Sequence, residues 1–128
     1  MKVSTVEWIE KAEGDWHTAQ LAYRARKRPN YDAACFHVQQ CVEKYLKARL
    51  NEAWIVPKKT HNLSDLLDDV LPAEPTWAAL RPVLTALTKY AVLHHYPKYN
   101  TTKIEAKAAV KDCREARRVI RVAFGLPV

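Results

Sequence analysis

Glycine is scarce in this chain, which has only Gly14 and Gly125 among its 128 residues. Phosphate-binding loops of the Walker and dinucleotide-binding types need several closely spaced glycines, so both motifs are excluded. The chain also lacks a run of about 18 consecutive apolar residues, the length that spans a bilayer. Its N-terminal segment carries acidic residues and no apolar stretch typical of a signal peptide. We therefore expect a cytoplasmic protein that does not enter the membrane.

Cysteine and clustered metal ligands are scarce as well. The three cysteines, at positions 35, 41 and 113, are odd in number and lack Cys-x-x-Cys spacing, which favours reduced thiols in a cytosolic protein over a disulfide framework. His94 and His95 are adjacent and would point apart on a helix, and the sequence contains no His-x-x-x-His or Glu-x-x-His pair. We expect no metal site and no cofactor.

The residues that are abundant favour helices. Apolar residues make up 48% of the sequence, and Ala, Leu, Lys and Arg are frequent. No segment alternates β-branched and polar residues as a half-buried strand does. A chain of 128 residues is long enough to bury a core without disulfides or metal. We predict one all-α domain covering residues 1–128.

Residues 31–53 carry the strongest helix signal. Apolar residues recur there in steps of three and four, which places them on one face of a helix with 3.6 residues per turn. These positions are Tyr31, Cys35, Val38, Val42, Tyr45, Leu46 and Leu50. We expect this face to lie in the core and this helix to organise the fold.

A polar stripe lies on another face of the same predicted helix. His37, Gln40, Lys44 and Lys47 line up there, with Glu43 beside them. Side chains of these types can bind a ligand. The plainer interpretation is an exposed Glu43–Lys47 pair, worth a few tenths of a kcal/mol, on a solvated surface of a helical bundle.

The first helix has its own start and stop signals. Ser4 and Glu7 have the spacing of a capping box, so we expect the helix to begin near Ser4. Its expected buried residues are Val6, Ile9, Trp16, Ala19 and Tyr23. Pro29 stops it, and Asn30 is then suited to cap the helix over residues 31–53.

Two more helices are expected in the middle of the chain. Thr60 or Asn62 can cap a short helix over residues 63–71. A longer helix is predicted over residues 76–94, which either kinks at Pro82 or begins one residue before it. Its expected buried residues are Trp77, Leu80, Leu84, Leu87 and Ala91.

The last helix carries much of the positive charge of the chain, which has a net charge of +7. It begins with a second capping box, formed by Thr102 and Glu105, and ends at Gly125. Its outer face forms one predicted cationic ridge of Lys103, Lys107, Lys111, Arg114, Arg118 and Arg121. The ridge suits an anionic partner or is simply solvated. Together the helices predict an up-and-down four-helix bundle with the short extra helix packed across one end.

The segment at residues 89–99 has the side chains for proton transfer. It gathers Lys89, Tyr90, His94, His95, Tyr96, Lys98 and Tyr99. An imidazole beside a cation is the minimum equipment for RNA cleavage without a metal, in which a 2′-hydroxyl is deprotonated and the phosphate is stabilised electrostatically. The alternative is structural, because His and Tyr also cap carbonyls and fill the end of a bundle.

Four segments together resemble the HEPN domain family. They are WIEKAEGDWHTAQL at residues 8–21, HVQQCVEKYLKARL at 37–50, KKTHNLSDLL at 58–67 and YAVLHHYP at 90–97. Within them, Gln40, Glu43, Lys44 and Lys47 match the family pattern Q-x-x-E-K-x-x-K, and His61 matches K-T-H. The resemblance implies a five-helix fold built on a four-helix bundle. It also implies a homodimer, often encoded beside a minimal nucleotidyltransferase in a toxin–antitoxin pair.

The sequence departs from the active ribonucleases of this family. Those enzymes carry an R-x(4–6)-H motif, whereas here Lys89 stands before His94 and His95 and lacks the planar guanidinium that grips phosphate with two hydrogen bonds. The departure leaves enzyme activity open.

Three hypotheses follow from the resemblance and the departure. The first is a nucleotide- or RNA-binding homodimer, acting with a minimal nucleotidyltransferase. Its ligand would contact Gln40, Glu43, Lys44, Lys47, His61 and Tyr96, in a space shared with His94 and His95. The second is a metal-independent endoribonuclease that uses His94, His95 and Lys89. The third is a dimerisation module without catalysis, for which Trp8 and Trp54 are candidate contacts.

Overall fold

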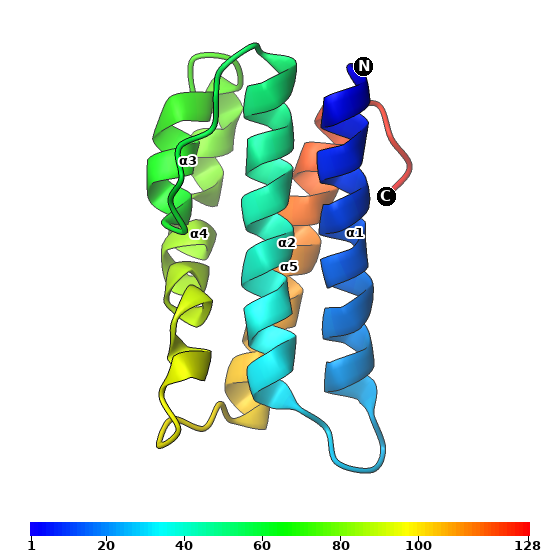
Figure 1. Cartoon of the computed structure of the whole chain (residues 1–128), viewed down its shortest axis with the longest axis vertical. Helices are drawn as coiled ribbons and strands as arrows, with labels where there is room; N and C mark the ends of the chain where they lie inside the picture. The colour runs from blue at the N-terminus through cyan, green and yellow to red at the C-terminus, as the bar shows by residue number, and fades with distance from the viewer.

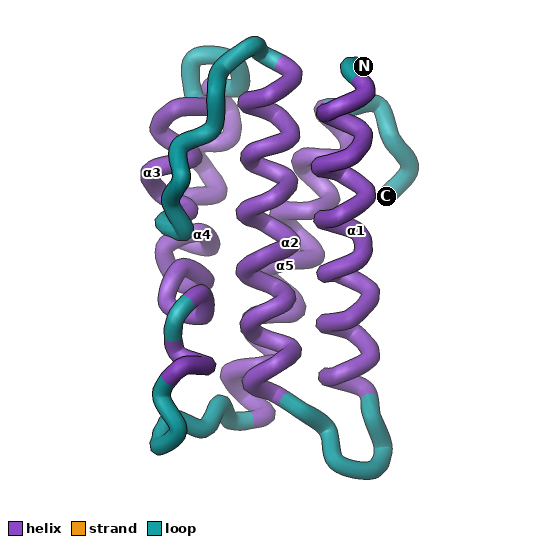
Figure 2. Tube along the Cα trace, in the orientation of Figure 1, coloured by secondary structure: helices purple, strands orange, loops and turns teal.

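The computed structural model describes all residues from 1 to 128 and consists of helices and loops only (Figures 1 and 2). The helices are α1 (Val3–Arg24), α2 (Tyr31–Glu52), α3 (Leu63–Val70), α4 (Arg81–Thr88) and α5 (Lys103–Ala123). Three 3-10 turns, η1 (Pro75–Leu80), η2 (Lys89–Ala91) and η3 (Leu93–His95), flank α4. The predicted all-α fold, an up-and-down bundle with a short extra helix, is confirmed.

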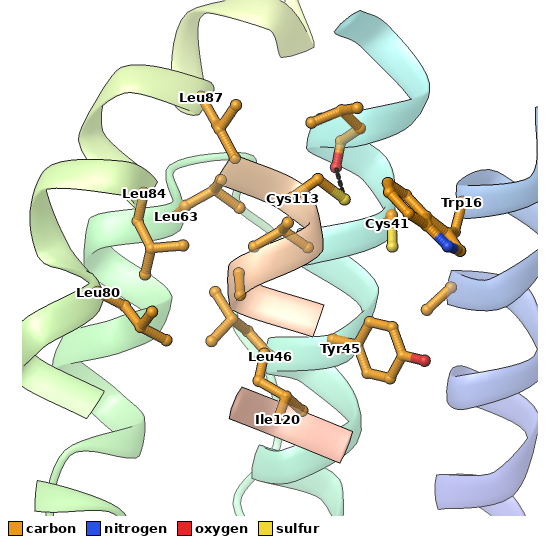
Figure 3. Packing of buried hydrophobic residues seen from close by; sticks show 14 of the residues in the cluster. Trp16, Cys41, Tyr45, Leu46, Leu63, Leu80, Leu84, Leu87, Cys113 and Ile120 are labelled. Atoms are coloured by element: carbon orange, nitrogen blue, oxygen red, sulfur yellow. Dashed lines mark hydrogen bonds between the residues drawn. The ribbon is translucent and has the colours of Figure 1, made fainter. Parts of the chain in front are cut away.

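The core is built around α2, which contacts α1, α3, α4 and α5. Each apolar position predicted on α2 is buried or half-buried, and Ala34, Cys41 and Ala48 are buried beside them. Figure 3 shows Tyr45 and Leu46 of α2 amid side chains from the other helices, including Trp16, Leu84 and Ile120. Because α2 is covered on several sides, its burial extends well beyond a single stripe.

Most predicted helix ends are confirmed. The Asn30 side chain accepts a hydrogen bond from the Ala33 N–H at 2.9 Å, and Asn62 caps α3 in the same way. Thr102 and Glu105 form the predicted capping box at the start of α5. These caps satisfy N–H groups that have no partner inside the helix, so the sequence alone is enough to place them.

The capping box expected at Ser4 and Glu7 is wrong. α1 begins at Val3 with Lys2 at its N-cap and has no side-chain cap. The Glu52 side chain, at the end of α2, accepts a hydrogen bond from the Lys2 N–H at 3.1 Å. Val6, expected in the core, is exposed, and Ala12 is buried instead. A carboxylate from the neighbouring helix therefore takes the role expected of Glu7.

An unbroken helix over residues 76–94 is not seen, although the alternative start one residue before Pro82 is confirmed. The helix α4 covers Arg81–Thr88, and 3-10 turns continue the chain on both sides. Pro82 lies at the start of α4, where its missing N–H is harmless. The residues expected to be buried along this segment are buried despite the breaks. His94 and His95 therefore lie in a separate 3-10 turn, η3, and the geometry of a long α-helix does not apply to them.

The short extra helix α3 lies alongside α2 and α4 and not across one end, as had been expected (Figure 1). Its four apolar residues, Leu63, Leu66, Leu67 and Val70, are all fully buried. Covering an end would leave part of this face in water, so the apolar spacing of α3 favours the side of the bundle.

Candidate functional site

The polar stripe of α2 is held by acidic partners. Asp15 of α1 binds two of its members: one carboxylate oxygen lies 2.8 Å from Nδ1 of His37, and the other accepts a hydrogen bond from the ammonium of Lys44. The Lys44 side chain is only 25% exposed. The Asp15 carboxylate thus links α1 to α2. Its negative charge also offsets the positive charge of Lys44, which an anionic ligand would need.

A second carboxylate, Glu43, anchors the loop that leads to α3. It is 4% exposed and accepts hydrogen bonds from Gln39 at 3.2 Å and from Lys47 at 3.1 Å, and Nδ1 of His61 lies 2.8 Å away. Gln39 also donates to the backbone carbonyl of His61 at 3.0 Å. Buried polar groups must be paired in this way, so the network stabilises the fold whatever else it does.

Gln39 was missed by the sequence reasoning, which singled out Gln40. Gln39 is fully buried, whereas Gln40 is half-buried and donates to the Gln39 side chain at 2.7 Å. The four-residue spacing of Gln39 and Glu43 was the available signal, because it places both on one helix face.

Two imidazoles stack at the other end of the α2 stripe. The ring centroids of His94 and His95 lie 3.9 Å apart, and the His94 ring lies 4.2 Å from that of Phe36. The expectation that these histidines point apart is therefore wrong. Burial, and then the neighbouring charge of His95, lowers the pKa of His94. Tyr96 is 60% exposed beside them, so the turn presents an open aromatic surface.

Lys89 does not join this aromatic surface. Its ammonium lies 5.2 Å from the centroid of the Tyr90 ring. Together with Glu105, Lys89 lines a cavity of about 230 Å³ between α4 and α5. The stacked histidines instead pack against Phe36 of α2. The cation predicted to steady a phosphate is thus turned toward α5.

Phe36, which packs against His94, precedes Lys44 by eight residues, or about 12 Å of helix. Convergence of the lysines of the stripe and the two histidines on one phosphate-sized space stays a prediction. Ligand binding by Gln40, Glu43, Lys44, Lys47, His61 and Tyr96 stays a prediction.

A set of unpaired cations surrounds the end of the bundle where the stacked histidines lie. We call this set the basic end: it comprises Arg24, Arg26, Lys27, Arg28, Lys98, Lys103 and Lys107, and none of them forms an ion pair. Figure 1 shows the α1–α2 loop, the chain after α4 and the start of α5 together at the lower end. A hydrogen bond of 2.7 Å from the Thr101 N–H to Asp32 ties the starts of α5 and α2 together.

The predicted ridge on α5 is basic only in part. Arg118 pairs with Glu115 at 2.7 Å. Arg121 turns toward Glu13 and donates a hydrogen bond of 3.0 Å to the Tyr45 hydroxyl. Lys103, Lys107, Lys111 and Arg114 form no ion pair, although the Arg114 guanidinium lies 5.7 Å from the centroid of the Trp16 ring. The periodicity of α5 predicts the ridge but not the loop cations that extend it around the end of the bundle.

Glu13 is the centre of an ionic cluster that joins α1, α2 and α5. Arg117 binds both of its carboxylate oxygens at 2.7 Å, and the Tyr45 hydroxyl donates to it at 2.6 Å. Burial raises the pKa of Glu13, but these hydrogen bonds and the charges of Arg117 and Arg121 outweigh burial and bring it below the ordinary value. The cluster is equipped to hold three helices together, and it leaves no free carboxylate for acid–base chemistry.

Metal binding and membrane insertion have no support in the structure. No group of three or more His, Cys, Asp or Glu side chains is arranged to hold a metal ion. No helix combines the length and the apolar character required for a membrane span.

The fold and the polar α2 stripe define a class of small helical bundles, and comparison with known proteins identifies the family. The model of the HEPN domain matches residues 5–123. The chain belongs to the HEPN domain family. A solved structure, that of TT1696 from Thermus thermophilus, superposes with a TM-score of 0.78 at 23% identity, covering 91% of this chain and 95% of the other. This likeness bears out the fold. No curated protein matches the chain.

Proposed function

We propose that this protein is a homodimer that binds RNA through its basic end and acts with a minimal nucleotidyltransferase in a toxin–antitoxin-like pair. The observation that carries the proposal is the position of the basic end beside the stacked imidazoles of His94 and His95. A strand that follows the cations with its phosphates would bring its bases to an aromatic surface. The partner and the dimer are supported by family membership alone.

The charge of the molecule is concentrated where the proposal needs it. Residues 24–32 and 94–107 together contain seven lysines and arginines and two carboxylates, which gives five of the net seven positive charges. Both carboxylates are already engaged: Asp32 accepts the Thr101 N–H, and Glu105 caps α5 and accepts the Tyr99 hydroxyl. Counterion release from RNA would therefore favour binding at this end.

Salt dependence tests the assignment. Binding of a fluorescein-labelled 20-nucleotide single-stranded RNA is measured by anisotropy between 50 and 300 mM salt. The double change Lys103→Ala and Lys107→Ala removes two phosphate contacts, so the slope of log K against log salt should fall by about 1.4. The matched control is Lys11→Ala, an exposed and unpaired lysine of α1 outside the basic end, which should leave the slope unchanged. Equal slopes in the double variant and the wild type would contradict RNA binding here.

Homodimer formation and pairing are tested separately from RNA binding. Sedimentation equilibrium gives the mass of the isolated chain, which is 14.7 kDa as a monomer. The proposal places a minimal nucleotidyltransferase in the adjacent gene, and coexpression with that protein should yield a complex that copurifies. A monomer that copurifies with no such protein contradicts this part of the proposal.

A second candidate function, a metal-independent endoribonuclease, is favoured by the histidine pair. The two rings lie 3.9 Å apart, so one imidazole can take the proton of a 2′-hydroxyl while the other protonates the leaving 5′-oxygen. Burial lowers the pKa of His94, which favours the neutral form that a general base requires. Lys89 lies over the Tyr90 ring, and we propose that other cations would steady the phosphate. RNA cleavage in EDTA should then be lost in His94→Ala and in His95→Ala but retained in Lys89→Ala. Cleavage that survives both histidine changes removes this candidate.

A further inference from the structure

The end of α2 has an aromatic residue where a glycine is usual. The Trp54 N–H donates to the Asn51 carbonyl at 3.1 Å, and the Ile55 N–H donates to the Leu50 carbonyl at 2.9 Å. This pair of bonds is the Schellman motif, whose central residue adopts a left-handed conformation. Trp54 has φ +62°. A bulky residue with positive φ is rare and strained, because its Cβ crowds the backbone.

The same motif ends α5 and has glycine at the equivalent position. There the Gly125 N–H donates to the Val122 carbonyl and the Leu126 N–H to the Arg121 carbonyl, both at 2.9 Å. Gly125 has φ +71°. The chain therefore ends both α2 and α5 with a Schellman motif. The left-handed position is occupied by glycine in α5 and by tryptophan in α2.

Packing within the chain does not account for Trp54. Its side chain is 82% exposed, and its contact is the ammonium of Lys2, which lies 3.5 Å from the ring centroid. An exposed cation–π contact is worth about 0.5–1 kcal/mol, which does not exceed the strain of the left-handed conformation. The indole is thus held outward at a fixed position with no net benefit to the fold.

Two other exposed apolar side chains adjoin Trp54. Ile55 and Val56 follow it in the chain, and Val56 is 89% exposed. We call these three residues the Trp54 shoulder. A shallow cavity of about 200 Å³ lies beside it, lined by Trp54, Ile55, Val56 and Pro57 among others. Contiguous apolar surface of this kind marks an interaction site, and tryptophan is the residue most enriched at the energetic centre of interfaces.

We infer that the Trp54 shoulder docks a partner protein whose contact surface is apolar at the centre and acidic at the rim. The positive charges around the shoulder indicate that the partner's surface carries acidic residues. Lys2, which lines the cavity beside the shoulder, has no ion pair, and neither has Lys59. The Lys58 side chain is 60% exposed although its ammonium lies 3.2 Å from the Asp69 carboxylate. The Glu52 carboxylate at the end of α2 already accepts hydrogen bonds from the Lys2 N–H and the Thr5 hydroxyl.

A second copy of this chain does not fit the shoulder. In a symmetric dimer through this surface, the same patch meets itself, so the lysines around it would face one another. Like charges at an interface are repulsive, whereas Asp and Glu on a different protein would be attracted. The homodimer of the proposed function must therefore use another face.

The shoulder and the basic end lie at opposite ends of the bundle. The shoulder follows the last residue of α2, and the basic end surrounds its first (Figure 1). The 22 residues of α2 separate them by about 33 Å. A protein on the shoulder leaves the RNA surface free, so both ligands can bind one molecule.

The inference rests on the proposed protein partner, and its test uses that protein as the probe. Binding of the minimal nucleotidyltransferase of the proposed pair is measured by biolayer interferometry. Trp54→Gly keeps the backbone conformation and removes the indole, and we expect affinity to fall at least about 30-fold, as for an interface hot spot. The control is Ile104→Ser, which alters an 82% exposed apolar residue at the start of α5 and should leave affinity within about twofold. Lys59→Glu should also weaken binding, chiefly by slowing association.

The outcomes separate this inference from the proposed function. If the wild type binds the nucleotidyltransferase and Trp54→Gly binds it equally well, the shoulder is not the docking site and the proposed pairing stands. If the wild type does not bind the nucleotidyltransferase, both the proposed pairing and the docking site are contradicted. RNA binding is then tested separately by the anisotropy assay. A change of oligomeric state in Trp54→Gly, measured by sedimentation, would show that the shoulder joins copies of this chain and would overturn the inference.

Discussion

The two Schellman motifs allow the strain at Trp54 to be measured. Trp54→Gly and Trp54→Ala both remove the indole and its contact with Lys2. The two variants therefore differ only in the free-energy cost of the left-handed backbone conformation at residue 54. Alanine keeps the left-handed penalty of about 1–2 kcal/mol, and glycine avoids it but adds about 0.5–1 kcal/mol of chain entropy to the unfolded state. We therefore expect the glycine variant to be more stable by about 1 kcal/mol.

Gly125→Ala provides the matched control. A Cβ added at Gly125 would meet no atom within 4 Å, so the change introduces backbone strain without a clash. It should lower stability by the same amount, about 1 kcal/mol, because the motif and the sign of φ are the same.

Thermal unfolding followed by circular dichroism detects this difference. For 128 residues, 1 kcal/mol corresponds to about 4 °C in Tm, from an unfolding entropy of roughly 2.1 cal/mol/K per residue. Trp54→Gly should thus melt about 4 °C above Trp54→Ala. Equal Tm values for the two variants, alongside a loss in Gly125→Ala, would refute the claim that Trp54 is strained. They would also remove one support of the proposed docking site.

Three other perturbations test the polar network, the ionic cluster and the buried thiols. Glu43→Gln leaves the ammonium of Lys47, 12% exposed, without its carboxylate and should cost about 3 kcal/mol in urea unfolding. The pKa of Glu13 is below its ordinary value of 4.5, so Glu13 contributes stability that is fully present above pH 4.5 and is lost as pH falls through the folded pKa; Glu13→Gln should show a flatter decline in acid. Burial raises the pKa of the Cys35 thiol to about 12, so Cys35 should resist iodoacetamide at pH 8 until the protein is unfolded.

The features that the sequence predicted well depend on neighbours within one helical turn. The apolar spacing of α2 identified its buried face, since helical geometry alone brings those positions together. The caps at Asn30, Asn62 and Thr102 involve side chains three residues from the N–H groups they bind. Local rules suffice for such features.

The features that it missed depend on contacts between distant segments. The start of α1 is set by Glu52, fifty residues along the chain from Lys2, so the local signal at Ser4 and Glu7 had a stronger competitor. The end of α4 breaks into 3-10 turns although its apolar spacing continues, because burial of that face does not require an unbroken helix. The packing of the His94 ring against Phe36 follows from that break and could not be predicted without it.

The residues that identify the family have a structural role that is independent of any ligand. Asp15, Glu43 and Lys44 belong to the family pattern, and each is paired across α1, α2 or the loop before α3. A chain can therefore keep these residues for its fold while it lacks the arginine of the active ribonucleases. The surfaces with unmatched charge or unmatched apolar area lie elsewhere, at the basic end and at the Trp54 shoulder. Because neither surface supports the core, substitutions there should change binding partners with little effect on the bundle, whereas substitutions in the polar network should lower stability first.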